Sequence, residues 1–325
     1  MSPILSVENL IVQLKSSQTS WLGVNDFSFH VNPQETVCIT GESGAGKTLT
    51  ILAILGLLPL HASVLAGNIN FTGKNLLGIS DQQIRDIRGK EIGVVFQEPG
   101  TALNPVMKIG DQLMEIFRRK EHYSKKQAQD ASLALLEQVG FHNSLSVFRK
   151  YSYQLSGGMQ QRILIAMAIS RNPKLLIADE PTTALDTTIQ AQIVELIEQL
   201  KADIGLSVLW ITHDLSLASR IADRTVIIYA GKTMEAAPTE TILATPYHPY
   251  TQGLLQSMPQ YALRHGCHLQ PIKGICKPSD SQNRCVFYTR CDQARPYCKM
   301  AQPPLKQIRP HHQAACWFHQ SVVTV

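Results

Sequence analysis

A glycine-rich turn between an apolar run and a helical run constrains this chain more than any other feature. Residues 37–40 (Val-Cys-Ile-Thr) predict a buried strand, and residues 49–58 favour a helix. The turn between them satisfies the P-loop pattern in its required context, and it reads Gly41, Glu42, Ser43, Gly44, Ala45, Gly46, Lys47 and Thr48. Its backbone N–H groups and the following helix N-terminus can hold phosphate oxygens. We therefore expect a nucleotide site in which Lys47 reaches the phosphates and Thr48 ligates Mg²⁺.

Further short apolar runs alternate with helical patterns along the chain. Residues 175–178, 207–212 and 226–229 predict strands, whereas Ile193, Leu196 and Leu200 follow helical spacing. Such alternation predicts an α/β fold with a parallel sheet covered by helices. Ligands of such sheets bind at the carboxyl ends of the strands, and the motifs of this chain fall there.

Two regions depart from this pattern. Residues of about 100–165 favour helices without intervening strands, which predicts a helical subdomain inserted into the sheet domain. After about Pro238 the periodicity fades, and six of the seven cysteines follow residue 266. We expect a nucleotide-binding domain over residues 1–238 and a small, irregular, Cys-rich extension over residues 239–325.

A pair of acidic residues follows the predicted strand 175–178. An acid in this place can bind Mg²⁺, and a second can deprotonate an attacking water. We assign Asp179 to the metal and Glu180 to the general base. Two acids at a strand end are more often simply solvated, but their combination with a P-loop favours the catalytic interpretation.

The bulk composition excludes several classes of protein. A hydrophobic fraction of 44% indicates a globular chain, and a net charge of +5 without a basic stripe argues against nucleic acid as a partner. The most apolar run, residues 51–60, is shorter than the ~20 residues that a membrane-spanning helix needs. No signal-peptide pattern opens the sequence. If the chain serves a membrane, we expect it to dock to other subunits.

The segment Leu155-Ser156-Gly157-Gly158-Met159-Gln160-Gln161-Arg162 precedes the second acidic strand. It resembles the LSGGQ-like signature of the ABC ATPase family, which implies a P-loop NTPase (RecA-like) fold and ATP hydrolysis. Ser156 can cap the helix, and Gly157 and Gly158 expose N–H donors at its N-terminus. Because the chain holds one P-loop, the resemblance implies a head-to-tail dimer in which this segment grips ATP held by a second ATPase subunit.

Other positions of that family are filled in order. Gln97, followed by Glu98-Pro99, resembles the Q-loop glutamine that senses Mg²⁺ and water. Asp186, in Ala184-Leu185-Asp186, resembles the D-loop, and His213 resembles the switch histidine that contacts the γ-phosphate. Trp21 is the nearest candidate for stacking on adenine, with a surface hydrophobe as the equal alternative.

The C-terminal part of the sequence resembles a particular group within that family. The run Pro246-Tyr247-His248-Pro249-Tyr250-Thr251 resembles the HPYT segment of oligopeptide, dipeptide and nickel importer ATPases. This implies two membrane permeases, an external substrate-binding protein, a second ATPase subunit in a heterodimer, and a peripheral place on the cytoplasmic face of a bacterial inner membrane. Residues 274–278 depart from the Pro-rich turn usual there, which bears on the cargo. Peptides are the favoured cargo, a nickel or metal chelate is the alternative, and a soluble ABC ATPase without a transport role is the third reading.

The clustered cysteines resemble the C-terminal cysteine motif of the same importers. Cys285, Cys291, Cys298 and Cys316 are separated by intervals unlike those of ordinary zinc fingers. Cytosolic chains seldom keep disulfides, so metal ligation is favoured, and spacing alone leaves Zn²⁺ and a [4Fe–4S] cluster even. The resemblance favours a structural iron–sulfur cluster. Reduced, unliganded thiols remain the other interpretation, and Cys267 and Cys276 are expected to be incidental.

Overall fold

The computed structural model describes residues 2–97, 99–120, 123–183, 185–266, 268–276 and 283–317. The chain divides into two compact units. The first unit comprises residues 1–84 and 209–325, and the second comprises residues 85–208. The described part of the C-terminal extension therefore belongs to the same unit as the P-loop. The domain boundary at residue 238 stays a sequence-based division.

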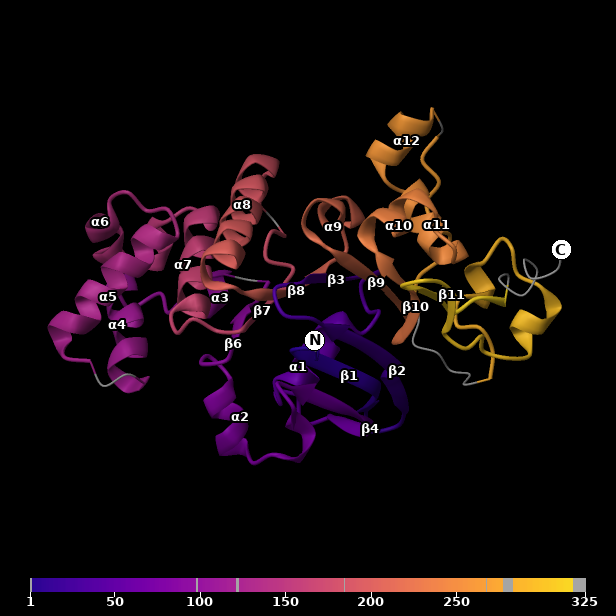
Figure 1. The fold of residues 1–325 in the computed structure, drawn as a ribbon, viewed down its shortest axis with the longest axis horizontal. Coiled ribbons are helices and arrows are strands. Elements are labelled where there is room, and N and C mark those ends of the chain that lie inside the picture. The colour runs from indigo at the N-terminus through magenta and orange to yellow at the C-terminus, as the bar shows by residue number, and fades with distance from the viewer. Residues whose placement is uncertain are drawn as a thin grey trace. The chain divides into compact units, whose positions relative to one another are not determined.

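The first unit contains strands, helices and short 3-10 turns from both ends of the chain (Figure 1). In chain order they are β1 (Leu5–Lys15), β2 (Ser20–Val31), β3 (Thr36–Thr40), α1 (Lys47–Ile54), β4 (Ala62–Phe71), β5 (Lys74–Asn75), η1 (Leu76–Gly78), α9 (Leu215–Ile221), β9 (Arg224–Tyr229), β10 (Lys232–Pro238), α10 (Thr239–Ala244), α11 (Pro249–Gln256), α12 (Pro259–His265), η3 (Tyr288–Arg290), η4 (Pro296–Lys299), β11 (Lys306–Arg309) and β12 (His312–Ala314). Two elements, α2 (Asp81–Ile87) and β8 (Ser207–Thr212), cross the unit boundary.

An antiparallel sheet of order β2-β1-β4-β5 forms one part of the first unit. Apolar residues alternate along β1, so that Leu5, Val7, Leu10 and Val12 are buried. The steps of two from Leu5 to Val7 and from Leu10 to Val12 are what a strand with one buried face requires, and the step of three between Val7 and Leu10 interrupts them. The register shifts between β1 and both of its neighbours, which marks β-bulges in the middle of the strand.

The P-loop strand belongs to a second, mixed set of strands. β3 pairs in parallel with β9, and β9 pairs in antiparallel fashion with β10. All five residues of β3 are buried, as expected for a strand covered on both faces. The hairpin β11–β12 then adds to β10 through the pair Glu235–Ala314. The C-terminal extension thus continues the strand order that contains the P-loop strand.

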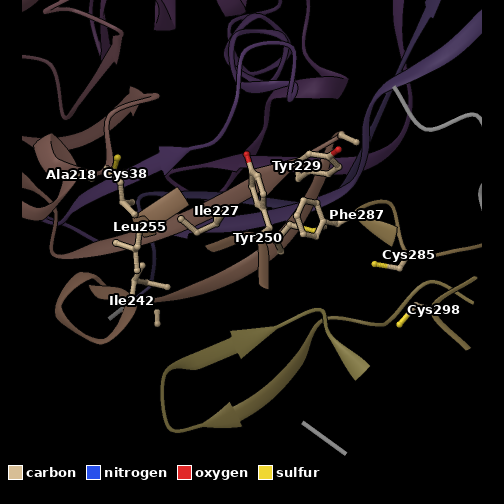
Figure 2. Packing of buried hydrophobic residues seen from close by; sticks show 14 residues of the cluster. Cys38, Ala218, Ile227, Tyr229, Ile242, Tyr250, Leu255, Cys285, Phe287 and Cys298 are labelled. Atoms are coloured by element: carbon tan, nitrogen blue, oxygen red, sulfur yellow. The ribbon is translucent and has the colours of Figure 1, made fainter. Parts of the chain in front are cut away.

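The extension also shares a hydrophobic core with the sheet. Its residues Tyr250, Phe287 and Cys298 are buried in one cluster with Cys38 of β3 and Met234 of β10. Figure 2 shows the rings of Tyr229, Tyr250 and Phe287 together, and their centroids lie 4.8–5.3 Å apart. The expectation of an irregular tail therefore describes its turns and loops but not its packing. Burial of such aromatic side chains stabilises a fold by about 1.5–3 kcal/mol each.

The second unit is mainly helical (Figure 1). Its elements are β6 (Ile92–Val95), α3 (Pro99–Ala102), α4 (Ile109–Lys120), α5 (Lys125–Gln138), α6 (Ser144–Phe148), η2 (Ser152–Gln154), α7 (Gly157–Ile169), β7 (Leu175–Asp179) and α8 (Thr187–Ile204). β6 and β7 pair in parallel. Between them the described residues form helices without strands, in agreement with the predicted helical insertion. A capping box at Ser124 and Gln127 explains why α5 begins where it does.

The elements confirm the predicted α/β fold, because parallel pairs β3–β9 and β6–β7 alternate with helices along the chain. None of the helices in the described ranges is both long and apolar enough to span a bilayer. The run 51–60, which is the most apolar in the sequence, instead forms the end of α1 and the turn after it.

Candidate nucleotide-binding site

The P-loop (residues 41–48) connects β3 to α1, as the sequence predicts. Gly46 is the N-cap of α1 and has φ of 104°, a backbone conformation that side chains with a Cβ rarely adopt. At Gly41 an added Cβ would lie 2.1 Å from the carbonyl oxygen of Ile228. Glycine is therefore required at both positions for steric reasons. Ser43, Gly44 and Thr48 are exposed, so this part of the loop is accessible from solvent.

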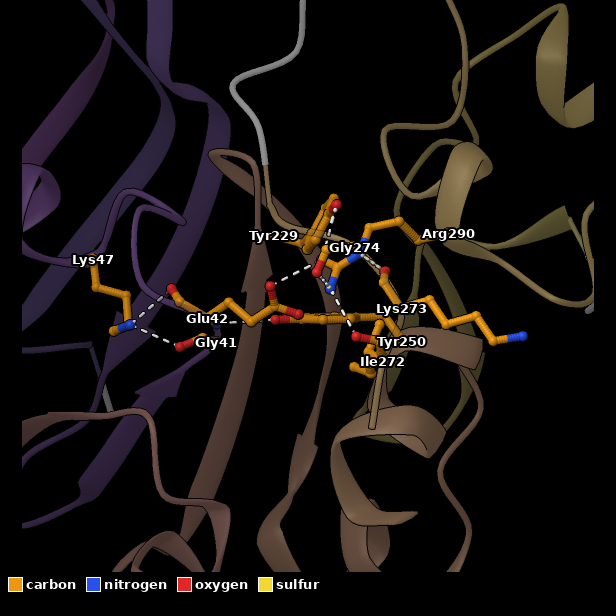
Figure 3. Close-up of polar contacts among 9 residues, drawn as sticks. All are labelled: Gly41, Glu42, Lys47, Tyr229, Tyr250, Ile272, Lys273, Gly274 and Arg290. Carbon is orange, nitrogen blue, oxygen red and sulfur yellow. Dashed lines mark hydrogen bonds and ion pairs between the residues drawn. The ribbon is translucent and has the colours of Figure 1, made fainter. Parts of the chain in front are cut away.

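Lys47 lies within its own loop. Its side chain is buried, with 5% of the residue exposed, and Nζ donates to the carbonyl oxygens of Gly41 and Glu42 at 2.7 and 3.0 Å (Figure 3). These bonds hold the ammonium against the backbone of the loop. A buried ammonium with carbonyl partners can exchange them for phosphate oxygens, which accept a charge-assisted hydrogen bond.

His213 follows β8 in the first unit and is exposed. The next residue, Asp214, caps α9 by accepting from the N–H groups of Ser216 and Leu217. This cap fixes the turn on which His213 is carried. The imidazole is thus presented to solvent at the carboxyl end of a buried strand, as the sequence predicts.

The second unit brings Gln97 and Glu180 together. Val95 pairs with Ala178, so the parallel strands β6 and β7 end side by side. Gln97 Nε2 donates to Glu180 Oε2 at 3.2 Å, and Thr183 Oγ1 donates to the same oxygen at 3.0 Å. Asp179, one residue earlier, is buried.

Glu180 also has a strained backbone. Its φ of 46° lies in the left-handed region, where a non-glycine residue costs of order 1–3 kcal/mol. Such strain persists where surrounding contacts hold it, and it is concentrated at functional sites. The two hydrogen bonds from Gln97 and Thr183 are contacts of this kind. The backbone conformation of Glu180 and the two hydrogen bonds together set the position of its carboxylate.

The signature-like segment opens α7 in the second unit. Ser156 is the N-cap and accepts from the N–H of Met159 at 3.4 Å, which confirms the helix-capping interpretation. Ser156 and Gly157 are exposed, so the first N–H groups of the helix face solvent. Gly158 is buried, and an added Cβ there would lie 2.5 Å from Ile189 of α8. The close approach of α7 and α8 therefore depends on this glycine.

Asp186 lies next to that segment. It caps α8 by accepting from the N–H of Ile189 at 2.9 Å, and it is exposed. The structure thus brings Ser156, Gly157 and Asp186 to neighbouring helix N-termini in the second unit. Ala184 of the predicted D-loop and Glu98 after the Q-loop glutamine lie outside the described residues. Trp21 lies half-buried on β2.

Four cysteines of the extension line one small cavity, together with aromatic residues such as Phe287 and Trp317. They are the four predicted from the sequence: Cys285, Cys291, Cys298 and Cys316. Burial raises the pKa of the Cys285 thiol to about 12 and also raises the pKa of Cys291, so both are neutral in this arrangement. Among the described residues, no set of three or more His, Cys, Asp or Glu side chains has the geometry of a metal site. Cys276 packs near Tyr229 instead, and Cys267 lies outside the described residues.

A buried carboxylate attaches the extension to β10. Glu235 is fully buried, and its carboxylate accepts from the backbone N–H groups of Tyr247 and His248 at 2.7 and 2.9 Å. It also lies 2.7 Å from Nε2 of His312 on β12. Burial lowers the pKa of His248 to about 4, and its Nδ1 accepts from the N–H of Tyr250, which caps α11. The HPYT segment therefore attaches the extension to β10 through hydrogen bonds to the buried Glu235.

Comparison with known proteins identifies the family. The profile of the family described as "ABC transporter" matches residues 24–183, and the profile described as "Oligopeptide/dipeptide transporter, C-terminal region" matches residues 234–298. The dipeptide transport ATP-binding protein DppD of Bacillus subtilis is 43% identical and covers 98% of this chain and 95% of its own. The chain belongs to the ABC transporter family. A putative peptide import ATP-binding protein of Brucella abortus is 42% identical over 98% of both chains.

Solved ABC cassettes have the same fold. The dimeric structure of MJ0796, a bacterial ABC transporter cassette, superposes with a TM-score of 0.64 at 25% identity, covering 72% of this chain and 98% of that chain. The cbiO1 structure from Clostridium perfringens has a TM-score of 0.66 at 21% identity, which shows the fold alone. The predicted P-loop NTPase fold and the ABC-type ATPase assignment are thereby confirmed.

Sequence reasoning missed two contacts of this ABC ATPase. Thr183 was assigned no role, yet it donates to the carboxylate of Glu180. Arg290, directly before Cys291 in the sequence, was also assigned no role, yet it forms an ion pair with Glu42 of the P-loop at 2.9 Å. The contact of Thr183 could have been predicted, because a residue three positions after Glu180 comes close to it when the chain turns. No local signal connects positions 42 and 290.

Proposed function

We propose that this ABC ATPase powers an importer that takes up dipeptides and oligopeptides. The observation that carries the proposal is the match of residues 234–298 to the oligopeptide/dipeptide transporter C-terminal region in the same chain as the ATPase segment. Relatives that carry peptide-transport names match along nearly the whole chain, for example DppD and AppD of Bacillus subtilis, at 43% and 39% identity.

In this proposal the P-loop binds the phosphates of ATP. The exposed loop at Ser43 and Gly44 and the N-terminus of α1 supply N–H donors, and Lys47 Nζ supplies a positive charge. On nucleotide binding Lys47 exchanges its bonds to the carbonyls of Gly41 and Glu42 for phosphate oxygens. His213 contacts the γ-phosphate from the end of β8. Several donors on one polyanion give both affinity and a fixed orientation.

Glu180 is the general base. Its carboxylate accepts a proton from the attacking water while Gln97 and Thr183 hold it in place through the two hydrogen bonds to Oε2. The strained φ of Glu180 fixes the direction of the side chain before ATP arrives. Pre-organisation of this kind removes part of the entropic cost of reaching the transition state.

The residues proposed for Mg²⁺ fit that ion by their donor chemistry. Thr48 offers a hydroxyl, Gln97 an amide oxygen and Asp179 a carboxylate at the end of β7, and Mg²⁺ prefers such oxygen ligands. When bound, the ion neutralises charge that develops on the phosphates. Asp179 is buried.

The exposed helix N-termini of the second unit support a partner ATPase subunit. Ser156, Gly157 and Asp186 lie at the starts of α7 and α8 and face solvent. Backbone N–H groups at such termini bind phosphate. We infer that they grip ATP held by the P-loop of a second ATPase chain in a head-to-tail heterodimer. Two permeases and an external binding protein complete the importer, and the chain works at the cytoplasmic face of a bacterial inner membrane.

Uptake by the reconstituted complex tests the cargo. The chain is co-expressed with candidate permeases, a partner ATPase and a binding protein, and the complex is placed in vesicles. We expect ATP-dependent uptake of a radiolabelled dipeptide or pentapeptide. Uptake of a nickel chelate without any peptide uptake would replace the proposed cargo with the metal alternative.

We also propose that the four cavity-lining cysteines hold a structural [4Fe–4S] cluster. The support is that all four predicted cysteines line one cavity and that Cys285, Cys298 and Cys316 are buried. An all-cysteine donor set suits such a cluster, and Zn²⁺ is the alternative ion. Metal binding would deprotonate the thiols and stabilise the extension directly.

Metal analysis tests this proposal. Anaerobically purified protein should be brown and contain about four irons per chain. Cys291→Ser should bleach it, whereas Cys276→Ser, the matched control outside the cavity, should keep the iron. Zinc without iron would replace the cluster by a zinc site. Metal-free protein whose four thiols are all alkylated in the native state would contradict both.

A further inference from the structure

Glu42 of the P-loop is enclosed by residues of the C-terminal extension. Its backbone N–H donates to Tyr250 Oη at 2.9 Å, and its carboxylate Oε2 accepts from Arg290 Nη1 at 2.9 Å (Figure 3). Its carbonyl oxygen accepts from Lys47 Nζ at 3.0 Å. The N–H, the carboxylate and the carbonyl of Glu42 are thus all hydrogen-bonded. Two of these three bonds go to residues more than 200 positions away in the sequence.

Arg290 is held rigidly in this contact. Its side chain is 6% exposed, and its guanidinium lies over the ring of Tyr229 with 5.6 Å from Cζ to the ring centroid. Nε donates to the carbonyl of Lys273 at 2.6 Å, Nη2 donates to the carbonyl of Gly274 at 3.1 Å, and Nη1 also donates to Tyr229 Oη at 3.2 Å. A guanidinium fixed by several acceptors loses little further entropy in holding Glu42.

The charge of Glu42 explains why such a partner matters. An unneutralised carboxylate in a loop that binds phosphates would repel a polyanion. The Glu42 side chain is 25% exposed and that of Arg290 is 6% exposed, so the pair is screened by water less than a surface pair would be. Neutralisation of Glu42 therefore changes the potential at the loop itself.

We propose that Arg290 is a positioning residue for nucleotide binding: it neutralises Glu42 and, together with Tyr250, sets the conformation of the P-loop. The inference rests on the proposed assignment of residues 41–48 as the ATP site. It gives the C-terminal extension a role in the ATPase reaction besides attachment. Arg290 ends η3, directly before Cys291 of the cysteine-lined cavity, so the fold of that region decides where the guanidinium lies.

Equilibrium binding of a non-hydrolysable ATP analogue to the full chain tests the charge role. Arg290→Met should raise the Kd about tenfold, the order of effect of one uncompensated charge near the site. In the assembled transporter KM for ATP should rise similarly, with kcat at saturating ATP within about twofold of wild type. Glu42→Gln added to Arg290→Met should recover most of the lost affinity, because it removes the charge that Arg290 neutralised. Arg309→Met is the matched control on exposed β11 and should leave the Kd unchanged.

Tyr250→Phe isolates the second contact, because it deletes the Oη atom that accepts from the Glu42 N–H. The Kd should rise about threefold, the effect of one neutral hydrogen bond of ~0.7 kcal/mol. Arg290→Gln, which is neutral but polar, replaces Arg290→Met if thermal unfolding shows that the latter does not fold.

The outcomes separate this inference from the proposed site. If Lys47→Ala binds the analogue like wild type, the P-loop assignment fails. If Lys47→Ala loses affinity while the neutral Arg290 variants bind like wild type, the role of Arg290 is overturned. Loss of affinity that Glu42→Gln does not relieve would also overturn it, since a purely structural role predicts no rescue.

Discussion

Replacement of Glu180 by Gln should separate ATP binding from ATP hydrolysis, because it changes the proposed base and leaves the P-loop intact. The carboxylate Oε2 accepts two hydrogen bonds, from Gln97 at 3.2 Å and Thr183 at 3.0 Å. A Gln side chain has the same length and keeps one oxygen acceptor, so the loss of stability should stay within about 1 kcal/mol. The amide cannot take up a proton, which removes the proposed base.

The expected rate effect follows from the proton transfer. General base catalysis contributes about 10²–10⁴-fold, which corresponds to ~2.7–5.5 kcal/mol in the activation free energy. We expect kcat of the assembled transporter to fall by that factor, measured by phosphate release at saturating ATP. The Kd for ATP should change less than about threefold.

A matched control comes from the same unit. Glu198 is exposed on α8, so Glu198→Gln changes one charge without touching the predicted site and should retain wild-type turnover. A Glu180→Gln variant that hydrolyses ATP within tenfold of the wild-type rate would refute the assignment of Glu180 as the base. Loss of ATP binding in that variant would instead show that the carboxylate supports the fold of the site.

Two further substitutions probe the phosphate loop and the attachment of the extension. Lys47→Ala should weaken ATP binding roughly 10- to 100-fold, because it removes one charge-assisted hydrogen bond of ~1.5–3 kcal/mol. The control Lys74→Ala, on exposed β5, should bind ATP normally. Titration with ATP measures both, and an unchanged Kd for Lys47→Ala would contradict the P-loop assignment. Glu235→Ala should lower the free energy of unfolding by about 3 kcal/mol, because it leaves two backbone N–H donors and His312 without their buried partner. The control Glu240→Ala, at an exposed position, should lower it by less than about 0.5 kcal/mol. Denaturant titration measures both variants, and equal midpoints would show that this buried carboxylate does not attach the extension.

Much of the candidate site could be predicted because it is local. The P-loop pattern, the acidic pair at residues 179–180 and the Gly-Gly start of α7 each place their chemistry within a few residues of a strand end or a helix start. Backbone geometry at such short range depends on the residues themselves: glycine supplies the φ of 104° at residue 46, and Ser156 caps its own helix. Local motifs of this kind are visible without a tertiary structure.

The C-terminal extension was harder to predict. Helices α10, α11 and α12 span six to eight residues, too few for a clear helical period of apolar residues. Their packing depends on Tyr250 and Phe287, which enter the core of β3, β9 and β10. An aromatic residue in a Pro- and Cys-rich sequence gives no indication of which sheet it will cover.

The sequence by itself determined the family, the fold class and the local structure of the segments that we propose bind phosphate, because each of these depends on contiguous residues. Only the tertiary structure showed that Gln97 bonds Glu180 across 83 residues and that Arg290 bonds Glu42 across 248. The first contact arises because parallel strands β6 and β7 end side by side. The second arises because the extension packs on β9 and β10, where a buried carboxylate and a shared aromatic core hold it. Contacts of this range depend on which surfaces are buried together, and no spacing in the sequence encodes that.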